Sequence, residues 1–278
     1  MNYKTMLMAS AAVLFASQAM AEDLTGAFSV PGKGQILSET TLGLTRTKTS
    51  WKVAGLGTVG SVINDSVFAT ETLEYGLSDK LSVNAGIINE FDVEGNYNNS
   101  HNFAYNLGAK YNTRYDDVLF QVGVRYNTWN PKSFNGHHNN DVRWQKSLGT
   151  DIKLGLDLGN GVTPYLVYSF DSDIDVKHRG IDQSVSLGVH KYAGKWALDG
   201  AVRYEWESNA DNGEGSGRAK KNSTETWFDV AGDYYLRDNV ALGLYGNYLV
   251  DAHDKSYGAD KEHTNFDYEV GLRVKVLF

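Results

Sequence analysis

One Asp–His pair and one pair of carboxylates come closest, by residue type and spacing, to a catalytic arrangement. Asp251 and His253 stand two positions apart in "LVDAHDK", and Glu90 and Asp92 do so in "INEFDVE". An aspartate that orients a histidine beside further carboxylates is one way to activate water for hydrolysis. The two pairs stand at positions that do not correspond along their two predicted strands. Paired carboxylates of this kind also often have only a structural role. We therefore expect no enzyme and assign no catalytic residue.

A run of aspartates, "DSDIDVKHRGID", is the strongest candidate for a metal site. Asp171, Asp173 and Asp175 stand near the ligand spacing of a calcium-binding loop. The sixth position is not glycine, however, and Lys177 occupies a ligand position. A solvated acidic loop is the favoured interpretation, and calcium binding at Asp171–Asp175 is left open.

The remaining motifs predict neither a cofactor nor a metal site. "GLGTVG" sets Gly55, Gly57 and Gly60 at the spacing of a dinucleotide fingerprint, which needs a strand before it and a helix after it. The residues that follow, "SVINDSVF", are strand-like, so we expect a flexible loop here. His137 and His138 have no carboxylate or thiolate placed to complete a metal site.

Charged residues recur at every second position between large apolar ones. In "DYEVGLRVKVLF", residues 267–278, one set of alternate positions is apolar or aromatic, and the other set is charged or glycine except for Leu277. A period of two predicts a β-strand with one apolar and one polar face. "WALDGAVRYEW", "VLFQVGVRYNTW" and "FAYNLGAKYNTRY" repeat the pattern.

The same alternation predicts twelve strands, an even number, as expected of a single-chain barrel. We place the strands at residues 34–46, 67–77, 81–93, 102–115, 118–130, 141–158, 162–172, 181–192, 195–208, 223–236, 239–251 and 263–278. The sequence therefore predicts an all-β protein, an antiparallel up-and-down transmembrane β-barrel whose apolar face meets lipid.

The connections between these strands alternate in length. Five have the composition of tight hairpin turns, at 78–80, 115–117, 159–161, 193–195 and 237–239. Six are longer and polar, at 47–66, 94–101, 131–140, 173–180, 209–222 and 252–262. Short periplasmic turns and long external loops are typical of outer-membrane barrels, and aromatic residues gather at both strand ends. A soluble sandwich would bury its apolar face and needs no such aromatic rings.

The N-terminal 21 residues have the features of an export signal. Lys4 is followed by an apolar run and by Ala19-Met20-Ala21, so we expect cleavage after Ala21 and a barrel at residues 22–278. The chain has no cysteine and hence no disulfide framework. Its net charge of −8 argues against nucleic acid as a partner.

The final strand resembles the C-terminal signature of bacterial outer-membrane proteins, in which alternating apolar residues precede a terminal phenylalanine. The resemblance implies recognition by the barrel-assembly machinery and a location in the outer membrane, with lipid and lipopolysaccharide as surroundings. The residues that would carry this assembly signal are Tyr268, Val270, Leu272, Val274, Val276 and Phe278. It implies no substrate family, and the oligomeric state is left open.

The polar faces predict the lining of the barrel. The candidate pore-lining residues are Glu90, Asp92, Arg125, Arg143, Arg203, Glu205, Glu207, Glu225, Asp229, Glu269, Arg273 and Lys275. Carboxylates dominate the half near the long loops, so we expect an acidic external mouth. Charges that face a narrow interior must pair or be hydrated, and the sequence leaves a plugged and an open lumen as alternatives.

The favoured function is a porin-like channel for small polar solutes or ions. Twelve-stranded channels for acidic oligosaccharides have arginine-rich lumens, from which this acidic mouth departs, and nucleoside channels share the size. The alternative is a surface structural or adhesion barrel that acts through its loops. A third hypothesis is a hydrolase of the omptin type, because the Asp251–His253 pair and the two carboxylates Glu90 and Asp92 loosely resemble the Asp–His pair and the acidic pair of that family.

Overall fold

The computed structural model describes residues 28–53, 57–94, 101–131, 145–174, 180–209, 222–255 and 260–278. The expected signal peptide, Gly55, Arg143, Asp175 and the pair His137–His138 lie outside the described residues. Within the described part, no helix is long and apolar enough to cross a membrane.

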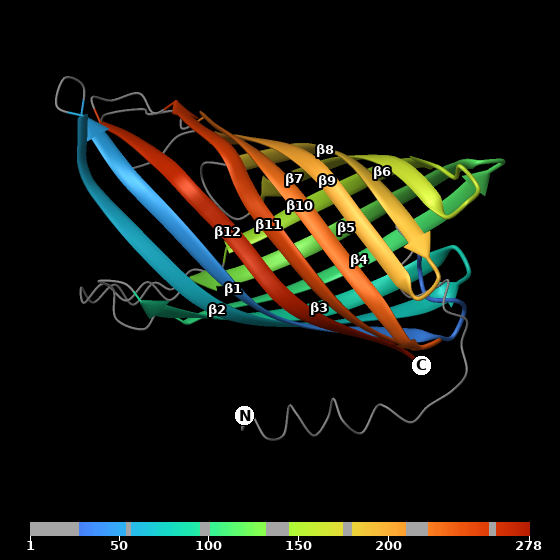
Figure 1. The fold of residues 1–278 in the computed structure, drawn as a ribbon. Helices are drawn as coiled ribbons and strands as arrows, with labels where there is room; N and C mark the ends of the chain where they lie inside the picture. The colour runs from blue at the N-terminus through green and yellow to red at the C-terminus, as the bar shows by residue number, and fades with distance from the viewer. Residues whose placement is uncertain are drawn as a thin grey trace.

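Twelve antiparallel strands form one closed barrel, as the sequence predicts (Figure 1). Each strand pairs with its neighbours along the chain, and β1 pairs with β12 to close the ring. The strands are β1 (Ile36–Val53), β2 (Gly57–Ser78), β3 (Leu81–Glu94), β4 (His101–Tyr115), β5 (Val118–Pro131), β6 (Gln145–Leu156), β7 (Val162–Asp173), β8 (Gly180–Ala193), β9 (Trp196–Asn209), β10 (Asn222–Arg237), β11 (Val240–Lys255) and β12 (Asp260–Leu277).

The outward positions of the strands carry the large apolar side chains. Leu42, Leu187 and Leu244 are between 56% and 65% exposed, although leucine is normally buried in a soluble protein. Alternate positions point inward, so polar residues line the interior. An apolar exterior around a polar interior is the distribution of a barrel surrounded by lipid.

Aromatic side chains form two belts on the exterior. One belt, at the end with the tight turns, includes Tyr75, Tyr115, Trp196, Tyr234 and Phe278; the other includes Phe91, Tyr105, Tyr204, Phe228 and Tyr248. Amphipathic aromatic rings at two levels fit the two interfaces of a bilayer. We call the two ends of the barrel the turn end and the loop end.

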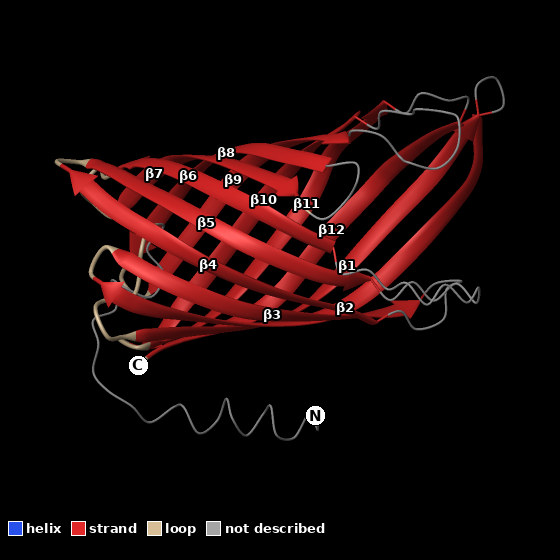
Figure 2. Cartoon of the chain, turned by 180° about the vertical axis from the view of Figure 1, so that it is seen from behind, coloured by secondary structure: helices blue, strands red, loops and turns tan. Residues whose placement is uncertain are grey.

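The five tight turns lie where the sequence places them, at the end that also holds the C terminus (Figure 2). Gly194 has a φ of +61° between β8 and β9, and Asp116 has a φ of +50° between β4 and β5. Glycine adopts this left-handed conformation without strain, and aspartate is among the residues that tolerate it.

The predicted loop at residues 47–66 is wrong, because β1 and β2 run on through most of it. Their pairing is continuous from Ile36 opposite Tyr75 to Val53 opposite Gly57, with one irregularity at Trp51/Lys52. Beyond residue 46 of β1 and before residue 67 of β2, apolar and polar residues no longer alternate regularly, so the period-two signal fades although the backbone pairing persists. Gly57 and Gly60 consequently belong to a strand and not to a flexible loop.

Three strands reach beyond the rest at the loop end. β1, β2 and β12 have 18, 22 and 18 residues, and Figure 1 shows them extending past their neighbours. β6 is described from Gln145 onward, and residues 141–144 of the predicted strand lie outside the described residues. The barrel therefore has a tall side at the closure of β1 with β12.

The closure uses the very last residue. Phe278 and Ile36 exchange two backbone hydrogen bonds of 2.8 and 3.0 Å. The alternate apolar positions of β12 face outward, with Val270, Leu272 and Val274 between 38% and 53% exposed. Their role as an assembly signal stays a prediction.

Candidate functional site

A cavity of about 580 Å³ opens inside the barrel toward the loop end. Five carboxylates line it, from Asp171, Asp182, Glu205, Glu207 and Glu225. Two guanidinium groups, those of Arg125 and Arg203, face them. We call this cavity, with its seven charged groups, the acidic vestibule.

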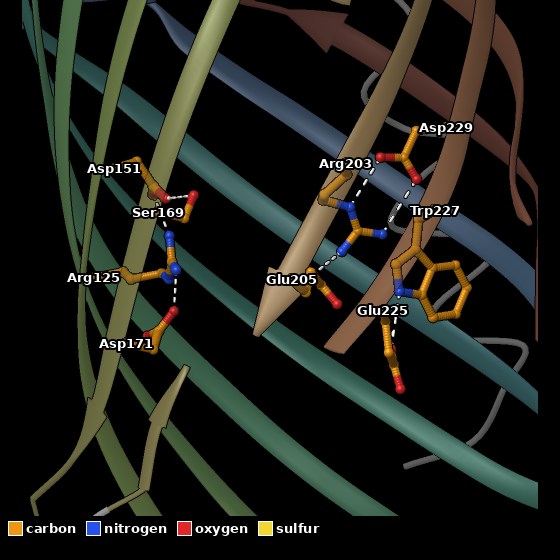
Figure 3. Close-up of polar contacts among 9 residues, drawn as sticks. All are labelled: Arg125, Asp151, Ser169, Asp171, Arg203, Glu205, Glu225, Trp227 and Asp229. Carbon is orange, nitrogen blue, oxygen red and sulfur yellow. Dashed lines mark hydrogen bonds and ion pairs between the residues drawn. The ribbon is translucent and has the colours of Figure 1, made fainter. Parts of the chain in front are cut away.

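One side of the acidic vestibule is organised around Arg125 on β5. Its guanidinium binds Asp151 on β6 and Asp171 on β7, and Ser169 Oγ donates to Asp151 at 2.6 Å (Figure 3). Arg125 thus spans three neighbouring strands. A guanidinium held by two carboxylates is fixed in position and loses its excess positive charge locally.

The other side is organised around Arg203 on β9. Its Nε and Nη2 donate to Asp229 on β10 at 2.9 and 3.2 Å, and its Nη1 donates to Glu205 (Figure 3). The guanidinium lies 5.3 Å from the ring of Trp227, whose Nε1 donates to Glu225 at 3.0 Å. Charge pairing and ring stacking both hold Arg203 against the wall.

Strand register brings like charges together across the rest of the vestibule. Asp182 on β8 stands opposite Asp171 on one side and opposite Glu207 on the other. Glu205 likewise stands opposite Glu225. Like charges in directly opposite positions repel, so this row is stable only where water or cations screen it. The vestibule therefore has a surplus of negative charge.

A second ion-pair network lies inside the turn end. Arg273 donates to both carboxylate oxygens of Asp233 at 2.7 Å, and Lys275 donates to the same group at 3.2 Å. Lys275 also lies 3.7 Å from Glu39. Asp233 is only 2% exposed, so this carboxylate depends on its cations for solvation.

Glycine makes both networks possible. Gly149 lies between Arg125 and Asp171 in the register, and Gly243 lies between Asp233 and Arg273. A Cβ at Gly149 would lie 2.3 Å from Asp171 Oδ1, and one at Gly243 would lie 1.9 Å from Asp233 Oδ1. The charged partners can meet across the intervening strand only because that strand has no side chain there.

We predict that Gly243→Ala destabilises the barrel by about 3 kcal/mol, because a methyl group would push apart a buried ion pair. The free energy of unfolding in urea, measured on the protein refolded in lipid, checks this value. Gly200→Ala is the matched control, since a Cβ there meets nothing within 4 Å. Equal stabilities of the two variants would contradict the role assigned to Gly243.

The segment before β1 enters the turn end of the barrel. Asn112 on β4 donates to the carbonyl oxygen of Phe28, and a Cβ at Gly155 on β6 would lie 2.4 Å from the Phe28 ring. Val30 and Pro31 are buried. The segment therefore crosses the opening from its attachment at β1 to β4 and β6. We call residues 28–31 the inner strap.

A cluster of polar groups lies behind the inner strap. Lys153 Nζ is 4.9 Å from the ring centre of Phe28 and 4.3 Å from that of Tyr165. Tyr165 donates to Asp199 at 2.5 Å, and His190 Nδ1 lies 3.3 Å from the other oxygen of Asp199. Side chains thus narrow the lumen at this end on several sides.

The remaining predicted lining residues are distributed over both halves. Ser66 donates to Glu90 at 2.6 Å, and Glu269 stands opposite Asn247 in the register of β11 and β12. Asp92 belongs to β3, but its side chain is outside the described part, as is all of Arg143. The contribution of the whole set to conduction stays a prediction.

The acidic run "DSDIDVKHRGID" is not simply a loop. Asp171 belongs to β7 and Asp182 to β8, as the predicted strands at 162–172 and 181–192 have it, and Asp173 also belongs to β7, so the predicted acidic loop is wrong for Asp173. Asp171 is bound to Arg125 instead. The described residues contain no group of three or more side chains arranged to hold a metal ion.

Sequence reasoning did not find the inner strap. "FSVPGKGQ" has no strand period, and its Pro-Gly and Gly-Gln steps indicate only irregular backbone. The available signal was the small residues that face it, Gly76 and Gly155, which leave room for the strap. A glycine on a strand indicates that another group packs closely against the strand there, but it does not identify that group.

Comparisons with known proteins agree on the architecture. No family model matches the chain, and no curated protein matches it. The COG4313 outer membrane channel from Pseudomonas putida F1 is similar in structure, with a TM-score of 0.58 at 14% identity over 91% of this chain and 98% of that one. At that identity the likeness concerns the fold.

Two other barrels are less similar in structure. The TodX monoaromatic hydrocarbon channel (deltaS2 mutant) has a TM-score of 0.47 at 10% identity, covering 93% of this chain and 96% of that chain. The translocator domain of the autotransporter NalP from Neisseria meningitidis has a TM-score of 0.46 at 14% identity, covering 98% and 95%. The chain is a twelve-stranded β-barrel of the bacterial outer-membrane type.

Proposed function

We propose that the protein is an outer-membrane channel for small polar solutes or ions that prefers cations. The observation that carries the proposal is the acidic vestibule, a hydrophilic cavity inside the barrel whose five carboxylates face two guanidinium groups. A barrel that served only as a scaffold for loops has no need of a charged cavity within it.

The vestibule has the properties of a selective entrance. Its wall is a thin protein layer surrounded by lipid, so field lines from the carboxylates concentrate in the water-filled opening. Cations accumulate there and anions are depleted, as at the acidic rings of cation channels. Arg125 and Arg203 do not cancel this field, because each is already shared between two carboxylates.

The turn end supports a narrow passage rather than a wide pore. The inner strap lies across the opening, and Ala197, Tyr235, Ala241 and Leu277 form an apolar cluster within the same end. The Asp233–Arg273–Lys275 network fills a further part of it. Solutes that pass must be small, or the strap must move.

Conductance of the refolded protein in planar bilayers tests the proposal. We expect single-channel steps, and a reversal potential in a salt gradient whose sign shows a preference for cations. The preference should weaken as salt rises, because the screening length falls from about 10 Å at 0.1 M to about 3 Å at 1 M. A correctly folded barrel without conductance, or one that prefers anions, would refute the proposal.

One observation favours surface display as a second function. β1, β2 and β12 continue beyond the apolar band, and Arg46 pairs with Asp65 at 2.5 Å on the outer face of this extension. A rigid paired ribbon outside the membrane presents a binding surface to other molecules. Binding of the protein to whole host cells or matrix proteins, lost when residues 48–62 are shortened, tests this function separately.

A further inference from the structure

One inward face of β6 leads from the acidic vestibule to the inner strap. Asp151, which binds Arg125, is followed on that face by Lys153 and then by Gly155, against which the Phe28 ring packs. Asp151 and Gly155 are four residues apart, which corresponds to about 14 Å along a strand. A solute that moves from the vestibule along this face toward the turn end therefore meets Lys153 and then Phe28.

The chain that follows the inner strap is bonded to the barrel through its backbone. Gly34 N donates to Gly76 O of β2 at 2.8 Å, and Gly76 N donates to Gln35 O at 3.0 Å. Pro31 is buried, and a Cβ at Gly76 would overlap its carbonyl oxygen. Residues 31–35, which we call the strap base, are therefore fixed to the end of β2.

The first described residue of the strap, Phe28, is held by side chains of the barrel wall instead. Asn112 Nδ2 on β4 donates to Phe28 O, and Gln121 Nε2 on β5 donates to Asn112 Oδ1 at 2.8 Å. Lys153 Nζ lies 4.9 Å from the centre of the Phe28 ring, within the range of cation–π attraction. Phe28 belongs to no strand, so it can leave these contacts without breaking the pairing of two strands.

Lys153 connects the strap to a fixed part of the wall. Its Nζ lies 4.3 Å from the ring centre of Tyr165 on β7, so the ammonium group is close to both rings at once. Tyr165 donates to Asp199 on β9 at 2.5 Å, and His190 on β8 lies on the other oxygen of Asp199. The Tyr165 ring is thus held by the wall, whereas the Phe28 ring is carried by the strap.

A second cavity, also of about 580 Å³, lies beside the strap at the turn end. Phe28 and Val30 line it from the strap, and Asn112 and Thr163 line it from the wall. An apolar cavity of about 150 Å³ is enough to hold a benzene ring. The space beside the strap is therefore large enough to take the Phe28 ring when the ring leaves Gly155.

We propose that the inner strap is a reversible gate, and that Lys153 is the residue that positions the Phe28 ring in the closed state. The gate rests on the proposed channel function. In the closed state the ring packs against Gly155 and narrows the passage; in the open state it lies in the second cavity while the strap base stays bonded. Protein segments with two such positions typically populate the minor one about 0.1–10% of the time.

Single-channel recordings of the refolded protein in planar bilayers test the gate. We expect two conductance levels, with the lower one, in which the Phe28 ring is in place, occupied most of the time. Lys153→Met keeps the length of the side chain but removes its charge, so the time spent at the higher level should rise about tenfold. Lys153→Arg should keep the wild-type value, because a guanidinium group also binds aromatic rings.

A methyl group at position 155 tests the place of the ring directly. Gly155→Ala should increase the time at the higher level, because the new Cβ would overlap the Phe28 ring. In the Phe28→Ala background the same substitution should have no further effect, since the ring is absent. Gly123→Ala on β5 is the matched control, because a Cβ at that glycine would lie no nearer than 3.7 Å to another atom.

Hydrogen exchange observes the strap without any current. In the refolded protein, the amides of Ser29 and Val30 should exchange faster in Lys153→Met than in the wild type. The bonded amides of Gly34 and Gln35 in the strap base should exchange equally slowly in both proteins. Heat-dependent migration on gels verifies that every variant is folded.

The possible failures of the gate and of the channel can be told apart. A conducting barrel with a single level, or with the same time at the higher level in all variants, would overturn the gate and leave the channel intact. Equal effects of Lys153→Met and Lys153→Arg would mean that the charge does not hold the ring. Additive effects of Gly155→Ala and Phe28→Ala would mean that the methyl group acts on β6 itself. A folded barrel that never conducts would refute the channel, and the gate with it.

Discussion

Removing residues 22–31, the first ten residues after the predicted cleavage site, should raise the single-channel conductance severalfold. The inner strap lies across the turn end, where Phe28 is anchored by Asn112 and rests over Gly155. A passage is limited by its narrowest part, so opening the turn end changes the current more than any change at the wider vestibule. Single-channel recordings of the two proteins in the same lipid measure the ratio.

Two smaller changes separate the ring of Phe28 from the chain that carries it. Phe28→Ala should give an intermediate conductance, because the backbone contact with Asn112 remains while the ring is lost. Lys33→Ala is the control, since Lys33 follows the inner strap and its side chain is exposed. If the shortened chain is folded and its conductance equals that of the full chain, the strap does not limit the passage.

The barrel itself can be predicted from the sequence, because the pattern that specifies each strand lies within that strand. Each strand must present apolar residues to lipid at every second position, so alternation is visible within a dozen residues. The five tight turns are equally local, since Gly194 and Asp116 supply the backbone conformations that the turns need. The strand count, the closure and the two aromatic belts follow from these signals, and the structure confirms them.

The ends of the strands were harder to predict. β1 and β2 keep pairing above the apolar band, where neither face is in contact with lipid. At positions such as Lys48 and Asn64 nothing requires apolar and polar side chains to alternate. The sequence of this part therefore resembles that of a loop. Hydrogen bonding between backbones needs no particular side chain, so this part of the fold leaves no pattern.

The partners within the lumen could not be predicted at all. Arg125 meets Asp171 from two strands away because Gly149 leaves space between them, and Arg273 meets Asp233 across Gly243 in the same way. Such contacts depend on the stagger of each strand against the next, which alternation does not encode.

Neutralising three carboxylates of the acidic vestibule should lower its preference for cations. Asp182→Asn, Glu207→Gln and Glu225→Gln remove negative charge from the row where like charges face each other. These three are a better choice than Glu205 and Asp229, which hold Arg203. Changing the latter would release a guanidinium and alter the structure together with the charge.

The expected result is a reversal potential that moves toward zero in a salt gradient, most strongly at low salt. Three fewer negative charges weaken the electric field at the entrance. At 0.1 M salt the screening length is about 10 Å, so the field still acts across the opening. Amides keep the size and the acceptor oxygen, so Trp227 can still donate to position 225. The barrel should therefore keep its stability.

The matched control changes the same number of charges at the other end. This control combines Asp116→Asn, Asp117→Asn and Asp238→Asn. The three aspartates lie in tight turns at the turn end, away from the vestibule. If selectivity arises in the vestibule, this control should leave the reversal potential close to that of the wild type. An equal shift in both triple variants would assign selectivity to the net charge of the protein, and no shift in either would remove the vestibule from the conduction path.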